Sequence, residues 1–451
     1  MAEKGDASVA PASLTALVRE LRFEALPADV VACAQRCLLD LVGVAAAARD
    51  LPSARLSRGH AIEHMRAAGR EARILFDGRR ASLPGAAFAG GALIDALDGH
   101  DGHVLTKGHA GAAVLPALLA YVEGGAPCGG PEFLACLVLG YEIATRAGIA
   151  LHATVADYHC SGAWNALACA AIGARLRRLS DAQSRHALGI AEYWGPRGQI
   201  LRVCEAPSML KDGSSWGAHA GVTAALMAEA GFTGAPAITV EGAPEHWSDI
   251  GTRFRIREQY FKAYPVCRWA QPAIEAALAV QCEHRFDAGD IASIAIESFR
   301  EAVDLGSRCL SPSTTDEAQY SLTYPVAAAL VHGRVGADEV NAAGRRDPRI
   351  ARLLGLMTLA ETSEFSQKFP AQRFARVTIT LHDGRVLASV PSQARGGPEN
   401  PLSDDELRTK YRALAEPAIG AARASRIETL IAALPRDDAA CAALCDELLT
   451  D

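Results

Sequence analysis

Helical periodicity dominates the first half of the chain and limits what it can fold into. From Leu14 to about Gly251, apolar residues recur with the spacing of amphipathic or fully buried helices, and Pro and Gly separate the segments. Stretches rich in Ala and Gly allow neighbouring helices to approach closely. The pattern therefore predicts a densely packed helical bundle. The expected helices include Asp29 to Ala47, Pro131 to Leu151, His159 to Leu179, Asp181 to Trp194 and Trp216 to Ala230.

The pattern changes after Lys262. Period-two alternation with β-branched residues predicts strands at Ile291 to Phe299 and Phe374 to Leu381. Asp383-Gly384 follows the second strand and favours a tight turn into a hairpin. This part of the chain should be a compact α+β unit. Its expected helices are Gln271 to Gln281 and about Asp316 to His332.

The last stretch, from Pro401 to Asp451, returns to helix and opens with Ser403 and Glu406, which can form a capping box. The simplest architecture is mainly α. A large all-helical domain would be formed by both chain ends, residues 1–260 and 398–451, with a smaller α+β lid domain, residues 261–397, inserted between them. Ligand sites favour such domain junctions.

Composition and charge exclude several classes of function. Hydrophobic residues make up 50% and charged residues 22%, with a net charge of −7, so no basic face for nucleic acid is expected. The start of the chain has no cationic segment followed by an apolar stretch and a cleavage site, which predicts a cytoplasmic protein. The apolar runs Leu41 to Ala48 and Ala112 to Val122 are too short to span a membrane.

Twelve cysteines are scattered along the chain without a CxxC motif. Cys33/Cys37 and Cys441/Cys445 have helical spacing among Ala and Leu, which favours buried small hydrophobic side chains. The arrangement argues against disulfides and against a cysteine-held iron–sulfur cluster.

The densest polar cluster runs from Asp95 to His109 and lies between two apolar segments. Buried charges are costly unless they are paired or employed, so this cluster is a candidate functional site; a solvated loop between helices is the alternative. His100-x-x-His103 could ligate a metal, but neither a HExxH helix nor a facial triad is present, and we expect no metal.

Three further positions carry ionisable residues in unusual settings. His159 stands at the entrance to an Ala-rich helix, although a single His there is commonly structural. Lys211 opens the next helix, with Asp212 as the expected N-cap, and a cation there fits an anionic ligand better than helix stability; an exposed lysine is the alternative. Lys262 lies between aromatic residues at the domain junction, with Arg268 one turn later, and could simply extend along apolar surface.

At these positions the chain resembles the MmgE/PrpD family. LDGHDGHVLTKGHAGAAVLPALLAYVE is similar to the family's Asp-rich loop, DYHCSGAWNALACAAIGARL to its second His motif, and SMLKDGSSWGAHAG to its Lys motif. FKAYPVCRWAQPAIEAAL, DEAQYSLTYPVAAALVHGRV and GGPENPLSDDELRTKY are similar to three later motifs. The similarities follow the family's order over about residues 10 to 430.

The resemblance implies a large helical domain with an α+β lid, a homodimer, and an active site between the domains that works without a metal or other cofactor. It also implies activities such as 2-methylcitrate dehydratase, cis-aconitate decarboxylase and iminodisuccinate epimerase, all on small polycarboxylates. The residues that it implicates are Asp98, His109, His159, Lys211 and Lys262, with Tyr324 as a weaker addition.

The chemistry of these reactions suits those residues. Breaking a bond next to a carboxylate builds negative charge that cations stabilise, while a group of near-neutral pKa moves a proton. We assign Lys211, Lys262 and Arg268 to carboxylate binding, and His109 and His159 to proton transfer. Asp98 would orient a His or the substrate hydroxyl. Further expected substrate contacts are Asp101, His103 and Cys267.

Departures from the family pattern bear on the reaction. Ala110 replaces a usual Pro, and the spacing from Asp98 to His109 is one residue longer than in the decarboxylase. Cys267 stands where the decarboxylase carries a second His, which argues against decarboxylation. We therefore expect a lyase that dehydrates 2-methylcitrate or a related hydroxy-polycarboxylate. An isomerase of a substituted succinate is the alternative, and a non-catalytic carboxylate-binding protein belongs to a different class.

Overall fold

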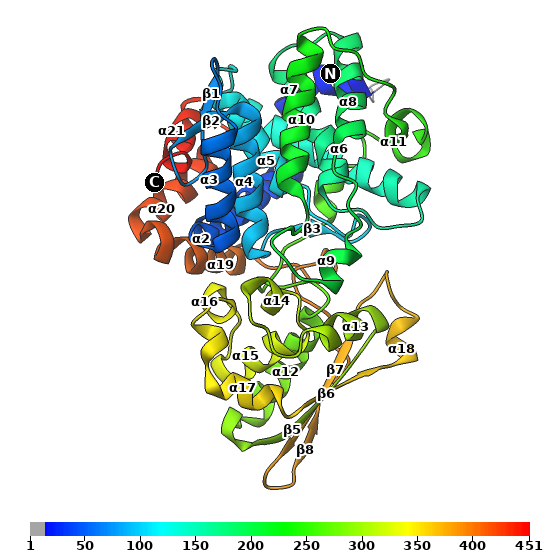
Figure 1. Ribbon diagram of the computed structural model, residues 1–451, viewed down its shortest axis with the longest axis vertical. Coiled ribbons are helices and arrows are strands. Elements are labelled where there is room, and N and C mark those ends of the chain that lie inside the picture. Colours follow the sequence, from blue (N-terminus) through cyan, green and yellow to red (C-terminus); the bar gives the residue numbers. More distant parts are fainter. Residues whose placement is uncertain (1–13) are drawn as a thin grey trace, which may run out of the picture.

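The computed structural model describes residues 14–451 and shows a helical body above a smaller α+β lid (Figure 1). The predicted absence of a signal peptide concerns a segment whose residues 1–13 lie outside the described part. The helical body uses both chain ends, and the lid comes from the segment between them. The residue bounds expected for the two domains stay a prediction.

Five helices form the buried centre of the body: α4 (Leu83–Leu97), α5 (Gly111–Glu123), α6 (Gly130–Thr154), α7 (Gly162–Leu176) and α10 (Ser214–Glu229). Most of their residues are buried on every side, so these helices are apolar all round rather than amphipathic. The helices around them are α1 (Leu14–Glu20), α2 (Ala28–Ala48), α3 (Pro52–His64), α8 (Asp181–Trp194), α9 (Leu201–Glu205) and α11 (Ile238–Glu241).

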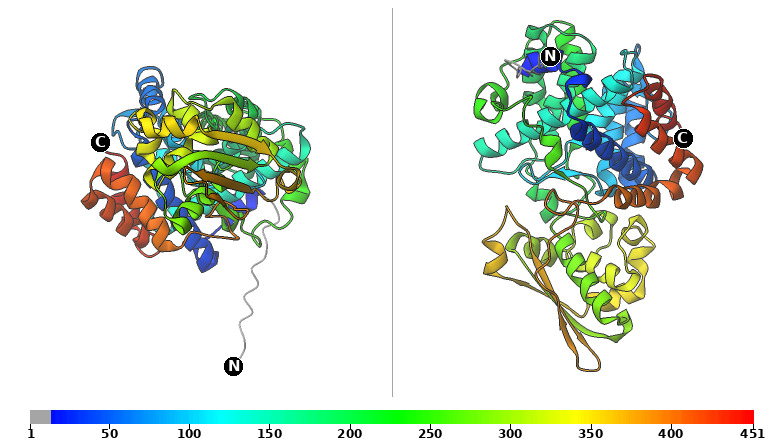
Figure 2. Two further views of the ribbon diagram at one scale, coloured as in Figure 1. Left: turned by 90° about the horizontal axis from the view of Figure 1, so that it is seen from below. Right: turned by 180° about the vertical axis from the view of Figure 1, so that it is seen from behind.

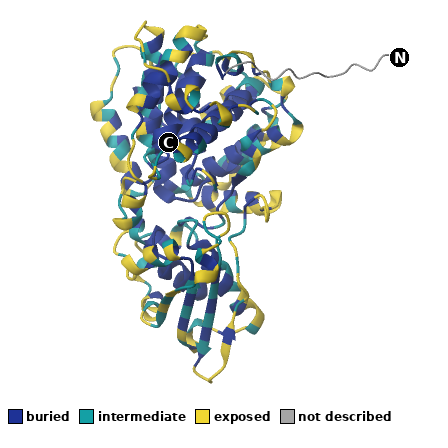
Figure 3. Ribbon diagram, turned by 90° about the vertical axis from the view of Figure 1, so that its right-hand side faces the viewer, coloured by how far each residue is buried: buried dark blue, intermediate teal, exposed yellow. Residues whose placement is uncertain are grey.

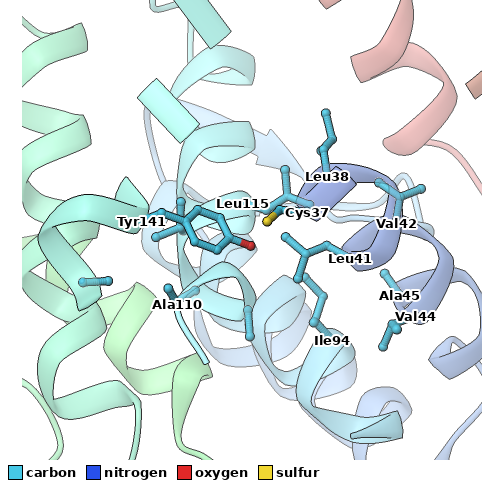
Figure 4. Close-up of a cluster of buried hydrophobic side chains, with 14 of the residues drawn as sticks. Cys37, Leu38, Leu41, Val42, Val44, Ala45, Ile94, Ala110, Leu115 and Tyr141 are labelled. Carbon is cyan, nitrogen blue, oxygen red and sulfur yellow. The ribbon is translucent and has the colours of Figure 1, made fainter. Parts of the chain in front are cut away.

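Figure 4 shows the apolar core where α2, α4, α5 and α6 meet. Leu41 of α2, Ile94 of α4 and Leu115 of α5 are fully buried there, and Tyr141 of α6 points its hydroxyl toward them. That hydroxyl donates a hydrogen bond to the carboxylate of Asp101. The core therefore anchors the polar segment that follows α4.

Helices α7 and α10 confirm the expected close approach of Ala- and Gly-rich segments. A Cβ atom on Gly217 of α10 would lie 2.7 Å from the Cα atom of Gly162 in α7. No side chain larger than hydrogen fits at that position without moving backbone. The tight packing holds the start of α10 next to the start of α7, at the lower edge of the body.

The C-terminal helices α19 (Asp404–Ile419), α20 (Ala421–Ala433) and α21 (Ala439–Leu448) pack on the body, α19 and α20 against α2 and α21 against α6, far from the lid sheet (Figure 2). A Cβ atom on Gly43 of α2 would lie 3.0 Å from the ring of Tyr411 in α19. Lys410 of α19 donates hydrogen bonds to the carboxylate of Asp40 and, at 2.7 Å, to the carbonyl oxygen of Gly99. The capping box of Ser403 and Glu406 at the start of α19 is confirmed.

The lid is built on a four-stranded sheet in the order β6-β5-β7-β8. Strand β5 (Ile291–Ser298) runs parallel to β6 (Met357–Glu361) and antiparallel to β7 (Ala375–Leu381), which forms a hairpin with β8 (Val386–Ala388). The hairpin turn contains Asp383 and Gly384, the latter with φ +90°, as the sequence predicts. Buried and partly exposed residues alternate along β7 (Figure 3).

Helices cover the inner face of this sheet (Figure 1). They are α12 (Gln271–His284), α15 (Thr323–His332) and α17 (Pro348–Leu354), with α13 (Arg300–Arg308), α14 (Thr315–Gln319), α16 (Ala337–Val340) and α18 (Ser363–Ser366) at its margins. The expected helix from about Asp316 to His332 is two helices, α14 and α15. Between them, the Ser321 hydroxyl accepts the amide N–H of Tyr324 in the first turn of the second helix, a local bond that competes with a continuous helix.

The predicted mainly α fold with a smaller α+β lid is confirmed, and the helical body also holds two short strand pairs: β1 (Glu71–Arg73) pairs with β2 (Arg80–Ser82), and β3 (Gly102–His103) pairs with β4 (Gln259–Tyr260). One further expectation needs correction. Asp212 is not the N-cap of α10. The cap residue is Gly213 with φ +65°, and the Asp95 carboxylate accepts the N–H of Ser214, so its partner comes from a different helix.

Two helices, α2 and α6, are long and apolar enough to cross a membrane by length and composition alone. Most of the apolar window of each is buried inside the protein, 67% in α2 and 94% in α6. Core helices of globular proteins have the same character.

Replacing Gly217 by Ala tests the close approach of α7 and α10. The added methyl group should force the two backbones apart, and we expect the free energy of unfolding to fall by about 1–3 kcal/mol. The matched control is Gly59→Ala in α3, where a Cβ atom meets nothing within 4 Å. The control should gain roughly 0.5–1 kcal/mol, because alanine favours helix over glycine. Urea unfolding followed by circular dichroism measures both, and equal effects would contradict the packing described here.

Candidate active site

A cavity with several charged residues in its lining lies where the lid meets the helical body, as expected for a ligand site. It has a volume of about 60 Å³ and is called the inner cavity below. The body contributes the loop after α4 and the turn before α10, and the lid side contributes the segment after β4. The side chains that line it include Asp98, His109, Asp212, Lys262, Cys267 and Arg268.

Asp98 and Lys262 form a buried ion pair at the centre of the site. Asp98 ends α4 in the left-handed conformation, with φ 56°, which turns its carboxylate into the cavity. The Lys262 ammonium lies 2.5 Å from that carboxylate and 3.0 Å from the Asp98 carbonyl oxygen. Burial disfavours the ammonium ion, but the charge of Asp98 outweighs it and raises the pKa of Lys262 above its usual range. Lys262 therefore stays protonated.

His109 is buried beside this pair with a defined tautomer. Its Nδ1 donates to the carbonyl oxygen of Asp101, and a carbonyl can only accept. Burial, and next the charge of Lys262, lower the pKa of His109 below its usual value of 6.5. A neutral ring with a proton on Nδ1 leaves a free lone pair on Nε2. His109 is thus prepared to accept a proton.

Asp212 faces that lone pair. Its Oδ2 atom lies 3.7 Å from Nε2 of His109, too far for a hydrogen bond but close enough for a proton to pass after a small shift. Burial raises the pKa of the Asp212 carboxyl, and the nearby charge of Asp98 adds to the effect. The site therefore holds a base and a carboxyl that resists ionisation side by side.

Asp98, His109 and Asp212 could in principle hold a metal ion, because one ligand atom from each lies within 4.8 Å of the others. The fit is poor for a divalent cation. The Lys262 ammonium already donates to Asp98 and occupies the position of positive charge. A metal ion there would stand next to a buried cation, which is strongly unfavourable.

The other members of the Asp95–His109 cluster are buried around the site. Asp101 lies beneath it, and burial raises the pKa of its carboxyl to about 7. The rings of His100 and His109 are tilted against each other with their centres 4.2 Å apart, and Nε2 of His100 lies 3.6 Å from the Asp95 carboxylate. His103 points the other way and lies 3.1 Å from Glu258. The cluster is not a solvated loop, and His100 and His103 face different partners rather than one metal.

Lys211 does not line the inner cavity but lies directly behind it. Its ammonium lies 2.7 Å from the carboxylate of Asp316 in α14 and donates to the Gln319 side chain. The amide of Gln319 in turn donates to the carbonyl oxygens of Ala96 and Leu97 at the end of α4. Lys211 therefore ties the lid to the body.

The remaining predicted residues fall into two groups. Cys267 and Arg268 line the inner cavity. His159 lies next to Tyr158, a residue of the cavity wall, but its own ring contacts the carbonyl oxygen of Arg197. Tyr324 is buried within the lid, where its hydroxyl donates to the carbonyl oxygen of Glu339. The structure does not bring His159 or Tyr324 into the inner cavity.

The inner cavity also contains residues that the sequence did not single out as site residues. Lys107 lies in the Asp95–His109 cluster and Asp212 directly follows Lys211, so both could have been identified from the motifs in the sequence. Tyr260 precedes the Lys262 motif by two residues. Arg373 comes from a lid loop between α18 and β7 that carries no motif, and only the fold brings it to the site.

Comparison with known proteins identifies the family of both parts of the chain. Residues 12–244 match the MmgE/PrpD N-terminal domain, and residues 264–436 match the MmgE/PrpD C-terminal domain. A cis-aconitate decarboxylase-like protein of Aspergillus oryzae is 25% identical over 94% of both chains. Cis-aconitate decarboxylase of Aspergillus terreus is 23% identical over 81% of both chains.

The mitochondrial 2-methylcitrate dehydratase of Yarrowia lipolytica is 28% identical over 43% of this chain and 42% of its own length. The names of these relatives describe lyases of two kinds. Because the two domain matches together cover most of the sequence, this chain belongs to the MmgE/PrpD family.

Proposed function

We propose that this protein is a metal-independent lyase that eliminates water from a small hydroxy-polycarboxylate such as 2-methylcitrate. The observation that carries the proposal is the state of His109. Its Nδ1–H is held by the Asp101 carbonyl, so the neutral ring presents a basic Nε2 beside the Lys262 ammonium. A base next to a fixed cation suits proton removal from a carbon that bears a carboxylate.

The elimination can be written with the residues of the cavity. Nε2 of His109 takes the proton from the carbon next to a carboxylate, and the electron pair moves toward that carboxylate, where Lys262 stabilises the charge. The electron pair then forms the carbon–carbon double bond as the hydroxyl leaves from the adjacent carbon. The Asp212 carboxyl, whose pKa is raised by burial, donates the proton that converts the hydroxyl to water. The proton on His109 returns to Asp212, 3.7 Å away.

The other implicated residues have supporting roles in this proposal. Asp98 holds Lys262 in place, and Arg268 binds a second carboxylate. Lys211 acts as a positioning residue, because its ammonium is already engaged by the lid. His159 keeps the proton-transfer role that the resemblance implies, since it adjoins Tyr158 of the cavity wall. Tyr324 has no direct role, since its hydroxyl is bound within the lid.

Decarboxylation is the second candidate, because the relatives that match most of the chain are named as cis-aconitate decarboxylase or as similar to it. Cys267 argues against it. Burial raises the pKa of the Cys267 thiol to about 12, so a neutral, weakly donating group stands where that enzyme is expected to have a second His.

The proposal also covers the setting in which the enzyme acts. We expect a homodimer in the cytoplasm, with no nucleic-acid or membrane partner. The family resemblance supports the dimer, and the net charge of −7 supports the absence of a nucleic-acid partner.

Proton exchange separates the candidate reactions. The enzyme is incubated in D₂O, with and without EDTA, with 2-methylcitrate, citrate, cis-aconitate or iminodisuccinate, and followed by NMR. We expect loss of water from a hydroxy acid, unaffected by EDTA. Loss of CO₂ from cis-aconitate would establish the decarboxylase, and exchange without elimination would establish an isomerase. Binding without exchange or turnover would show a carboxylate-binding protein.

His109→Asn should lower kcat about 10²–10⁴-fold, as for loss of a general base. In the wild type, the neutral base persists down to pH values below 6.5, because burial lowers its pKa. We therefore expect kcat/KM to fall only when the pH drops below 6.5 and His109 becomes protonated. Measuring kcat/KM as a function of pH tests this. The matched control is His382→Asn at the exposed hairpin turn, which should leave both unchanged. A fully active His109 variant would rule out this base.

Lys211→Met tests the tie between lid and body. It leaves Asp316 buried without its partner, so we expect the free energy of unfolding to fall by about 3–5 kcal/mol. Adding Asp316→Asn should recover part of this loss, which a double-mutant cycle by urea unfolding quantifies. Lys368→Met, which removes an exposed ion pair of 3.4 Å, should cost less than about 1 kcal/mol. Additive effects of Lys211→Met and Asp316→Asn would contradict the coupling.

A further inference from the structure

A second, outer cavity adjoins the inner one and is much larger, with a volume of about 510 Å³. His103, Leu105 and Glu258 line it from the body side, and Arg268 and Arg373 line it from the lid side. The same two arginines line the inner cavity. They therefore stand at the boundary between the two spaces.

Arg373 has no hydrogen-bond or ion-pair partner among residues 14–451, and its Nε atom is buried. Its guanidinium carbon lies 5.8 Å from the centre of the Phe369 ring. A buried guanidinium nitrogen without an acceptor costs free energy in the folded protein. A bound ligand that supplies the hydrogen-bond acceptor would remove this cost.

Two neighbouring cations are also without a carboxylate partner within the described chain. Arg268 donates only to neutral oxygens, the carbonyls of Phe261, Ala394 and Arg395 and the Gln271 side chain. Lys107 lies over the ring of Tyr158, 3.9 Å from its centre, and forms no ion pair.

The positive charge of Arg373 acts on both of the other cations. Burial and, to a smaller extent, the charge of Arg373 lower the pKa of Arg268 to about 10. Burial and next the charge of Arg373 lower the pKa of Lys107. Glu258 does not pair with these cations, because it is engaged by His103, Arg253 and Arg255. Glu399 also lines the outer cavity and its charge acts on Arg268, but no ion pair joins the two within the described residues. Positive charge is thus concentrated at the boundary, in contrast to the paired charges around Lys262.

The size of the inner cavity also indicates that a substrate extends past these cations. A single water needs roughly 10–15 Å³ of such space, so about 60 Å³ admits only a few non-hydrogen atoms. A tricarboxylate cannot fit there whole. If its reacting carbons lie at His109 and Lys262, its far end must extend toward the outer cavity and pass the two arginines.

We propose that Arg373, together with Arg268 and Lys107, binds the carboxylate of the substrate that lies farthest from the reacting carbons. Guanidinium groups bind carboxylates through two parallel hydrogen bonds, and burial strengthens such pairs. The site therefore selects a tricarboxylate over the matching dicarboxylate. This inference rests on the proposed function, since it assumes a polycarboxylate with its reacting end in the inner cavity.

Two acids that differ by one terminal carboxylate test the inference. Tricarballylate is propane-1,2,3-tricarboxylate, and methylsuccinate is propane-1,2-dicarboxylate. Their dissociation constants are measured by isothermal titration calorimetry with the full-length wild type and with Arg373→Gln. We expect Arg373→Gln to weaken tricarballylate binding at least tenfold and to change methylsuccinate binding less than twofold. Arg373→Lys should restore part of the difference.

The matched control is Arg385→Gln, which removes the same charge from the lid hairpin, where Arg385 pairs with Asp383 at 2.7 Å. It should leave both dissociation constants unchanged. Circular dichroism melting of each variant shows whether it is folded. Unchanged tricarballylate binding in Arg373→Gln, an equal loss for both acids, or a wild type that binds neither acid would overturn the inference.

Turnover in D₂O on the same preparations separates this inference from the proposed function. The wild type could dehydrate a substrate while Arg373→Gln shows the same ratio of tricarballylate to methylsuccinate affinity as the wild type. That result would overturn the role of Arg373 and leave the proposed lyase standing. A wild type that shows the expected ratio of affinities without proton exchange would overturn the lyase and support the carboxylate site.

Discussion

The buried ion pair of Lys262 and Asp98 determines how the two parts of the molecule meet. Asp98 ends α4 in the body, and Lys262 follows β4, which pairs with β3 just beyond Asp98. A buried charge without its partner would cost several kcal/mol, so each residue requires the other. This fixes the loop after α4 against the lid side of the chain. The positions of His109 and Asp212 in the cavity depend on that fixed loop.

Charge is distributed unevenly around the site. At the reacting centre, Lys262 is paired with Asp98, and His109 faces Asp212, so these groups are oriented before any substrate arrives. Such preorganised dipoles and charges stabilise a transition state without the cost of rearrangement. At the boundary of the two cavities, Arg373 has no hydrogen-bond or ion-pair partner within residues 14–451. The paired groups around Lys262 are therefore suited to proton transfer, and the unpaired Arg373 is suited to binding a carboxylate of the substrate.

The sequence was a good guide to the elements and a partial guide to the site. Periodicity located α8 to the residue, and the Asp-Gly pair located the lid hairpin, because both signals are local. Capping of α10 could not be predicted, since the acceptor for Ser214 is Asp95, far away in the chain. Lys211 was identified, but its partner Asp316 depends on how the lid docks. Arg373 had no local signal at all.

The attachment of α19 to the body has a consequence for how the protein is made. Lys410 reaches the carbonyl oxygen of Gly99 in the middle of the Asp-rich loop, so one support of the site comes from the last helices of the chain. Ribosomes release the N-terminal segments first, and domains generally fold as units during synthesis. The loop after α4 therefore lacks its partners Lys262 and Lys410 until the lid and the final helices have been synthesised. Chains that stop before α19 should be dependent on chaperones and should lack an ordered active site.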